Sequence, residues 1–268
     1  MQSIRTSDGV RIVFAVHAGD PSLPRLALVH SLGMDHAFWE PVVERLAPYA
    51  SILTIDARGH GSSDKPAGPY AAERMADDLR DVADAIGWPA MTVAGASMGG
   101  CVALQFAGSH AARTQGLGLI DTTSWYGPDA SKDWAARAER ARTQGLAALI
   151  DFQRTRWFSD AFQAEHPDVV QQCVDTFLRN DVAAFAATCA MLGAFDGGAL
   201  LAGIRVPTRV IVGDEDYAAP LPMAQALHGG IAGSTLKVIA GARHLTPLET
   251  PDVVAAELRA LLPSTSRG

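Results

Sequence analysis

The stretch VAGASMGGCVAL, Val93–Leu104, decides how the rest of the chain is interpreted. A strand-like apolar run meets Ser97, which stands between Gly95 and Gly99, and a helix-like run follows. The pattern G-x-S-x-G is typical of a sharp strand-to-helix turn that exposes a serine hydroxyl as a nucleophile. Side chains at the flanking positions would collide with neighbouring backbone, so such a turn needs glycine there. We therefore take Ser97 as the candidate nucleophile.

A serine hydroxyl is a poor nucleophile at neutral pH, so a base must take its proton. Among the eight histidines, His244 lies in GARHLTPLETPD, between the last expected strand and the last expected helix. A loop at that point leaves a parallel sheet at its carboxyl edge, where Ser97 is also expected. His244 is therefore the candidate base.

The base needs a carboxylate that fixes its tautomer and stabilises its charged form. VGDEDYAAP follows the preceding strand and offers Asp214, Glu215 and Asp216. We prefer Asp216, the acid furthest out on the loop, and expect Asp214 to bond to the turn backbone. Asp121, at the end of another strand, is the reserve candidate. Serine, aspartate and histidine then follow in the chain order expected for a hydrolase of this type.

Backbone N–H groups should stabilise the oxyanion that forms when the serine attacks. One donor is expected after the nucleophile, at Met98, and the other at Leu32 in LVHSLGMDHAFW. We expect His30 to brace this loop rather than to catalyse. We likewise interpret DARGHGSSDKP, residues 56–66, as a tight loop of structural importance.

Strand-like and helix-like runs alternate outside the middle of the chain, which predicts an α/β fold with a mostly parallel sheet. The expected strands are Val10–Val16, Leu26–His30, Ser51–Asp56, Met91–Ala96, Gly116–Asp121, Thr208–Val212 and Leu236–Ile239. An amphipathic helix is expected over Tyr70–Gly87, with Gly87 as its C-terminal cap.

Strand signals vanish between about residues 122 and 201, where helical runs take over. Helices are expected over Lys132–Arg142, Leu146–Phe158, Pro167–Arg179 and Val182–Leu192. A helical block inside a β-α alternation indicates an inserted cap. We therefore predict a core of residues 1–121 and 202–268 and a helical cap, or lid, of residues 122–201.

Composition excludes several classes of function. Of 268 residues, 48% are apolar and 19% charged, which is typical of a globular protein, and the net charge of −7 argues against nucleic-acid binding. The chain has no membrane-spanning run and no apolar leader, so we expect a cytoplasmic location and no membrane partner. Three cysteines without a CxxC pair predict neither a disulfide framework nor a zinc site.

Taken together, HSLGMDHAFW, DARGHGSSDKP, GASMGG, VGDEDYAAP and GARHLTPLETPD resemble the α/β-hydrolase superfamily over nearly the whole chain. The resemblance implies an eight-stranded, mostly parallel sheet flanked by helices. HSLG, GASMGG and the segment RWFSDAFQAEHPDVV, residues 156–170, look most like 3-oxoadipate enol-lactonases. That family implies hydrolysis of a small anionic enol-lactone in aromatic catabolism, without a cofactor or metal.

An anionic lactone would need a cation in the pocket. Arg154, Arg156 and Arg179 lie in the expected cap, and Arg156 is our candidate for the pocket. Trp125 and Trp157 are candidate pocket walls, although each could instead pack the cap on the core.

We therefore expect a serine hydrolase of small-molecule carboxylic esters or lactones that works through an acyl-enzyme. A C–C bond hydrolase of a ring-cleavage product and a small-ester esterase or perhydrolase are alternatives with the same three residues. A ligand receptor on a hydrolase scaffold is the non-enzymatic alternative. The sequence leaves open whether the chain forms a homo-oligomer.

Overall fold

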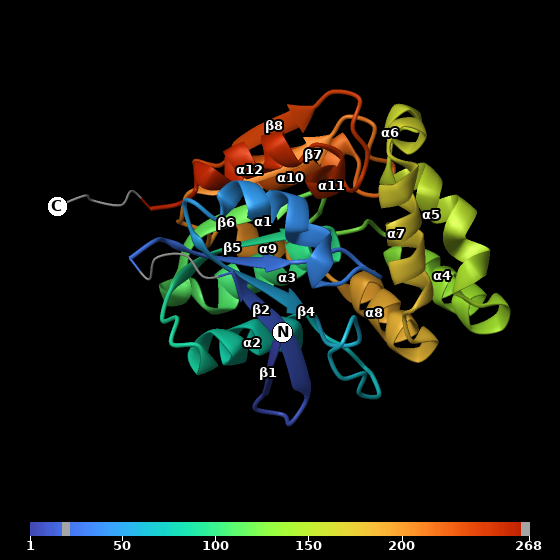
Figure 1. Ribbon diagram of the computed structural model, residues 1–268, viewed down its shortest axis with the longest axis horizontal. Helices are drawn as coiled ribbons and strands as arrows, with labels where there is room; N and C mark the ends of the chain where they lie inside the picture. The colour runs from blue at the N-terminus through green and yellow to red at the C-terminus, as the bar shows by residue number, and fades with distance from the viewer. Residues whose placement is uncertain (18–21, 264–268) are drawn as a thin grey trace.

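A computed structural model describes residues 1–17 and 22–263 of the chain (Figure 1). Its centre is an eight-stranded sheet with the strand order β1-β2-β4-β3-β5-β6-β7-β8. β2 pairs antiparallel with both of its neighbours, β1 and β4, and all other neighbouring strands pair parallel, so the predicted mostly parallel sheet is confirmed. The strands are β1 (Gln2–Arg5), β2 (Arg11–His17), β3 (Arg25–Val29), β4 (Ser51–Asp56), β5 (Met91–Ala96), β6 (Thr114–Ile120), β7 (Thr208–Gly213) and β8 (Thr235–Ile239).

Burial of the strands follows their place in the sheet. All residues of β4 and β5 are buried, because helices cover both faces of the central strands. Both strands begin and end where the sequence predicts. The sequence analysis missed β1, whose residues QSIR are mostly exposed at the sheet edge and carry little apolar signal.

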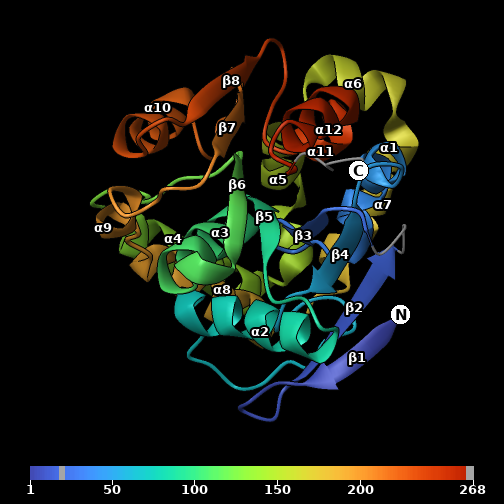
Figure 2. The same ribbon diagram turned by 90° about the vertical axis from the view of Figure 1, so that its left-hand side faces the viewer.

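Helices cover both faces of the sheet (Figure 2). On one face lie α1 (Glu40–Leu46), α11 (Thr246–Glu249) and α12 (Pro251–Arg259), and on the other lie α2 (Ala72–Ala85), α3 (Met98–Ser109) and α10 (Leu221–Gly230). The predicted amphipathic helix is α2, which buries Met75, Leu79 and Val82. Gly87 follows its end with a φ of +71°, a conformation that suits a glycine after a helix.

The chain between β6 and β7 forms a run of helices. Each of the four helical runs expected there is found. The elements are α4 (Ala130–Gln144), η3 (Leu146–Leu149), α5 (Ile150–Trp157), α6 (Asp160–Glu165), α7 (Pro167–Leu178), α8 (Val182–Ala194) and α9 (Gly198–Leu201). Of these, α4 to α8 stand together beside the sheet, whereas α9 lies near α3 (Figure 1). We call residues 122–201 the cap segment.

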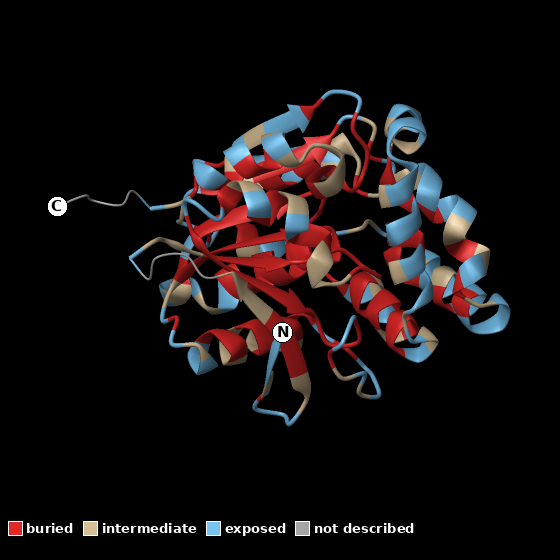
Figure 3. Ribbon diagram, viewed as in Figure 1, coloured by how far each residue is buried: buried red, intermediate tan, exposed pale blue. Residues whose placement is uncertain are grey.

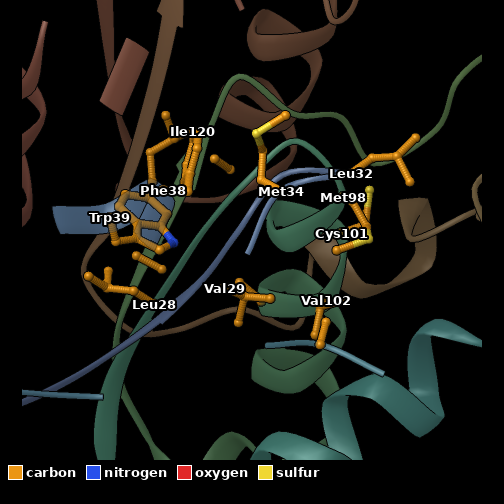
Figure 4. Packing of buried hydrophobic residues seen from close by; sticks show 14 of the residues in the cluster. Leu28, Val29, Leu32, Met34, Phe38, Trp39, Met98, Cys101, Val102 and Ile120 are labelled. Atoms are coloured by element: carbon orange, nitrogen blue, oxygen red, sulfur yellow. The ribbon is translucent and has the colours of Figure 1, made fainter. Parts of the chain in front are cut away.

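Buried residues concentrate in the sheet and on the helix faces toward it (Figure 3). Figure 4 shows Val29 of β3, Phe38 of the short helix η1 (His36–Trp39) and Val102 of α3 in this core. Cys101, like the other two cysteines, is buried and free. Within the described residues, no helix has the length and apolar character to cross a membrane.

Candidate active site

Ser97 stands in a strained turn between β5 and α3. Its φ is +54°, unusual for a residue with a side chain, and its N–H donates to the carbonyl of Ile120 at 2.9 Å. The glycines of the motif are required by close backbone contacts. A Cβ on Gly99 would lie 2.0 Å from the carbonyl oxygen of Val29, and one on Gly95 would lie 2.0 Å from the carbonyl oxygen of Gly99. The chain therefore follows this turn only with glycine at both positions.

The structure brings Ser97, His244 and Asp216 together in one hydrogen-bonded row. His244 Nδ1 lies 2.8 Å from Asp216 Oδ2, and His244 Nε2 lies 2.8 Å from Ser97 Oγ. Because a carboxylate only accepts, Nδ1 must carry the proton, which leaves Nε2 of the neutral ring to accept from the serine hydroxyl. This is the arrangement in which a histidine can take the serine proton during attack.

Asp216 is held as a carboxylate. Burial alone would raise the pKa of Asp216, but the charge and hydrogen bond of His244 and the N–H groups of Ala218 and Ala219 lower it below its usual value. Those N–H groups donate to Oδ1 at 2.7 and 2.9 Å, so one oxygen serves the backbone and the other serves the histidine. Asp214 instead accepts from the N–H of Gly241, as expected for a residue that holds the turn.

Asp121, the reserve candidate, lies beneath the histidine loop and has other partners. Its Oδ2 accepts from the N–H of Thr246 at 3.0 Å and from the Thr246 hydroxyl at 2.7 Å. Burial and the nearby charge of Asp216 hold the pKa of Asp121 well above its usual value. Asp121 is thus suited to hold the loop of His244 as a neutral group, and Asp216 is the acid that meets the imidazole.

The two expected oxyanion donors lie at the same edge of the sheet. The close contact of Gly99 with the backbone of Val29 and His30 packs the start of α3 against the loop that carries Leu32. In the described part of the chain, the N–H groups of Leu32 and Met98 donate to no other protein atom. Two free N–H groups at this edge are what a forming oxyanion requires.

His30 braces the loop of Leu32, the role expected from the sequence. Its ring is fully buried, with Nδ1 2.8 Å from the carbonyl of Ser31 and Nε2 3.0 Å from the N–H of Ala57. Nδ1 therefore donates and Nε2 accepts, which makes the ring neutral. Burial lowers the pKa of His30, in agreement with that state.

The loop of residues 56–66 is held by its own polar groups. Asp56 accepts from the backbone N–H and Nδ1 of His36 and from the N–H of Ser62. Arg58 forms a buried ion pair with Asp78, with Nε 2.6 Å from Oδ2. These contacts match the structural role that the sequence analysis assigns to the loop.

A cavity of about 40 Å³ lies between Ser97, His244 and the cap segment. Trp157 and Arg156 line it, as expected, but Trp125 does not. Trp125 is 47% exposed, pairs through its backbone with Asp196 and is not among the residues that line this cavity. The cavity is lined by Ser31, Leu32, Ser97, Tyr126, Trp134, Arg137, Gln153, Arg156, Trp157, Ala218 and His244.

Arg137 on α4 is the lining residue that the sequence analysis missed and that matters most. Its guanidinium lies over the rings of Trp134, at 4.3 Å, and Phe152, at 5.0 Å. None of the ion pairs within residues 1–17 and 22–263 involves Arg137. Burial lowers its pKa. The sequence contains a pattern that indicates this placement. Trp134 and Arg137 are three residues apart and share a helix face with buried Ala138 and Ala141.

Of the cap arginines considered from the sequence, Arg156 also lines the cavity and forms no ion pair within the described residues, but unlike Arg137 it donates a hydrogen bond to the protein. Arg156 donates to the carbonyl of Tyr217 and lies 4.6 Å from the centre of the Phe152 ring. Arg154 is exposed, and Arg179 is exposed and lies 3.7 Å from Asp35. Arg154 and Arg179 are not among the residues that line the cavity.

The cap segment is bonded to the loop of the candidate base. The N–H groups of His244 and Leu245 donate to the carbonyls of Arg156 and Trp157, at 3.3 and 3.0 Å. The end of α5 therefore runs beside the histidine loop. No cluster of side chains suited to hold a metal ion occurs in the described chain.

Comparisons with known proteins agree with this fold. The sequence model of the Alpha/beta hydrolase family matches residues 26–257. The 3-oxoadipate enol-lactonase 1 of Acinetobacter baylyi is 30% identical over 236 residues, which cover 87% of this chain and 86% of that protein. A putative carbamate hydrolase of Azorhizobium caulinodans is 28% identical over 90% of this chain and 91% of its own length.

Solved structures give the same result. The enol-lactonase from Burkholderia xenovorans LB400 superimposes with a TM-score of 0.92 at 30% identity, over 97% of this chain and 99% of that chain. A thermophilic esterase from Thermogutta terrifontis, solved with malate bound, has a TM-score of 0.89 at 28% identity, over 97% of this chain and 96% of that chain. The chain therefore belongs to the alpha/beta hydrolase family and is a hydrolase.

Proposed function

We propose that this hydrolase cleaves carboxylic esters or lactones through an acyl-enzyme, and that 3-oxoadipate enol-lactone is its substrate. His244, oriented by Asp216, takes the proton of Ser97 as its oxygen attacks the carbonyl carbon. The N–H groups of Leu32 and Met98 hold the oxyanion, and the ring C–O bond then breaks. The protonated His244 gives its proton to the leaving oxygen, which stays tethered to the acyl group. Water activated by His244 then releases the acid and restores the serine.

The observation that carries the choice of an anionic substrate is the half-buried guanidinium of Arg137, which lines the cavity and forms no ion pair within the described residues. A charge that loses part of its hydration without gaining an opposite charge is costly. A substrate carboxylate could accept two parallel hydrogen bonds from the fork of this guanidinium and offset that cost. Arg137 shares a cavity with Ser97 and His244, so an ester placed for attack would keep a second, charged end near α4.

The names of the relatives support the same choice. Two of the similar proteins are 3-oxoadipate enol-lactonases, and the esterase from Thermogutta terrifontis holds malate, a dicarboxylate. An anionic lactone fits both the reaction class and the half-buried cation. Carbamate is an anion too, so a cation at Arg137 suits both classes of relative, and the choice of the lactone rests on the more similar enol-lactonases.

We also propose that residues 122–201 act as a lid. A cavity of about 40 Å³ holds only a few water molecules, since one needs about 10–15 Å³. Movement of α4, which carries Trp134 and Arg137, would widen the cavity for a six-carbon lactone. We further predict that the protein acts on a small-molecule ester or lactone and that it is located in the cytoplasm. Whether it forms a homo-oligomer stays open.

The test follows hydrolysis of 3-oxoadipate enol-lactone by ultraviolet absorbance, with phenyl acetate as a neutral ester. Ser97→Ala should lose activity on both by several orders of magnitude. Arg137→Gln should lower kcat/KM for the lactone about 10- to 100-fold, the worth of a hydrogen bond to a charged group, and change phenyl acetate less than about threefold. Arg154→Gln removes the same charge from an exposed site and should match the wild type.

Different results discard different parts of the proposal. Cleavage of phenyl acetate without cleavage of the lactone would keep the serine hydrolase and discard the named substrate. A coloured ring-cleavage product or acetate with peroxide would then test the C–C hydrolase and perhydrolase alternatives. If no ester is cleaved, a ligand-dependent rise in melting temperature would favour the receptor.

A further inference from the structure

One polar contact ties the cap segment to the loop that carries Leu32. Asn180 follows α7, and its side-chain nitrogen Nδ2 donates to the carbonyl oxygen of Gly33 at 2.8 Å. The ring of Phe177 packs beside this contact, so closely that a Cβ on Gly33 would lie 2.6 Å from its carbon Cδ2. The end of α7 therefore presses against the candidate oxyanion loop and also donates a hydrogen bond to it.

This contact begins a row of hydrogen bonds that leads to Leu32. The Gly33 carbonyl and the Met34 N–H belong to one peptide group, and that N–H donates to the carbonyl of Ser31 at 3.1 Å. The Ser31 carbonyl and the Leu32 N–H form the next peptide group. Because a trans peptide is planar and its carbonyl and N–H point in opposite directions, fixing the Ser31 carbonyl also aims the Leu32 N–H.

We propose that Asn180 is a positioning residue of the oxyanion hole, through which the cap segment orients and polarises the Leu32 N–H. The inference rests on the proposed role of Leu32 as an oxyanion donor. Asn180 Nδ2–H donates to the first peptide group, that group donates to the second, and the second donates to the oxyanion. Hydrogen bonds in such a row strengthen one another, so the last donor becomes a better one.

The other anchor of the loop does not replace Asn180. His30 Nδ1 also donates to the Ser31 carbonyl, from the core side, and so holds the second peptide group. In the described chain, the Gly33 carbonyl has Asn180 as its side-chain donor. Without that donor the Gly33–Met34 peptide can rotate, and the bond from Met34 N–H to Ser31 weakens. Displacement of α7 would have the same effect, which links the position of the lid to the competence of the site.

A purely structural role for Asn180 makes a different prediction. Its Nδ2 also lies 3.1 Å from the carbonyl of Thr176 and 3.0 Å from that of Phe177, at the end of α7. If Asn180 only capped this helix, its loss would reduce stability without a specific effect on the transition state. Asp181 provides the matched control, because it is the next residue and caps the start of α8 by accepting from the N–H of Ala184 at 2.8 Å.

The experiment compares Asn180→Leu, Asn180→Ala and Asp181→Ala with the wild type on p-nitrophenyl acetate. Leucine keeps the approximate size of asparagine and has no donor, and alanine serves if leucine does not fold. A whole oxyanion donor contributes about 10²–10³ in rate, so loss of its orientation should lower kcat about tenfold with KM within about threefold. A trifluoromethyl ketone, which adds to Ser97 as an oxyanion, should bind the same variants about tenfold more weakly.

Asp181→Ala should lower the melting temperature and leave kcat and inhibitor affinity within about twofold of the wild type. The proposal is overturned if the folded Asn180 variants keep wild-type kcat and inhibitor affinity, or if Asp181→Ala loses as much. Ser97→Ala, run in parallel, distinguishes failure of the proposed function from failure of the role proposed for Asn180. If that variant stays active, or if the wild type does not cleave the ester, the proposed function fails; if Ser97 is essential and Asn180 is neutral, only this inference fails.

Discussion

Asp216→Asn should abolish most of the activity by reversing the tautomer of His244. The Asp216 oxygen Oδ1 accepts from the N–H groups of Ala218 and Ala219, whereas Oδ2 accepts from His244 Nδ1. An asparagine has one acceptor oxygen. Placing its NH₂ group against two N–H groups would bring donors together twice, so the oxygen stays with the backbone and the NH₂ group faces the imidazole.

The histidine must then accept at Nδ1, so its proton moves to Nε2. Nε2 lies 2.8 Å from Ser97 Oγ and can no longer take the serine proton. A change of tautomer of this kind lowers kcat about 10⁴-fold in a serine protease, which corresponds to about 5.5 kcal/mol of transition-state stabilisation. We expect a loss of the same order here, with little change in the fold.

Initial rates on p-nitrophenyl acetate measure this loss, and Asp121→Asn is the matched control. Asp121 is as buried as Asp216, receives the same substitution, and has a pKa held well above its usual value by burial and by Asp216. Because Asp121 is then largely neutral, an amide with an oxygen toward Thr246 should keep kcat within about threefold.

The reasoning fails if Asp216→Asn retains kcat within tenfold of the wild type while folded. It also fails if Asp121→Asn loses as much as Asp216→Asn, because Asp121 would then share the role of the acid. Circular dichroism and melting temperature show whether each variant is folded.

Two further predictions concern the stability of the fold around the site. Burial lowers the pKa of His60 from 6.5 to about 3, so the unfolded chain binds a proton between these values and stability rises with pH across that window. Acidification from about pH 6.5 to about pH 5 should therefore cost about 2 kcal/mol in urea unfolding, and His60→Gln should reduce that slope. Gly99→Ala should destabilise the fold by at least about 3 kcal/mol, since the added Cβ meets the carbonyl oxygen of Val29 at 2.0 Å; an unchanged urea midpoint would contradict the backbone contact.

Local patterns were sufficient for much of the fold. β4 and β5 carry continuous apolar runs because helices cover both of their faces, and they begin and end where predicted. The period of α2 is visible because one face is buried and the others are charged. β1 and α6 escaped prediction because they are short and mostly exposed, so neither carries an apolar period.

For the site, the sequence by itself determined the turn of Ser97 and the three residues now found in one hydrogen-bonded row. Glycines and a serine at fixed spacing are a local steric requirement, and the chain order of acid and base follows from the order of strands. Only the tertiary structure decided which side chains of the cap segment reach the site. Trp125 lies outside the pocket and Arg137 inside it, and Asn180 reaches Gly33 across 147 residues. Helical periodicity shows which face of a helix is buried but not against which partner, because that depends on how helices pack in three dimensions.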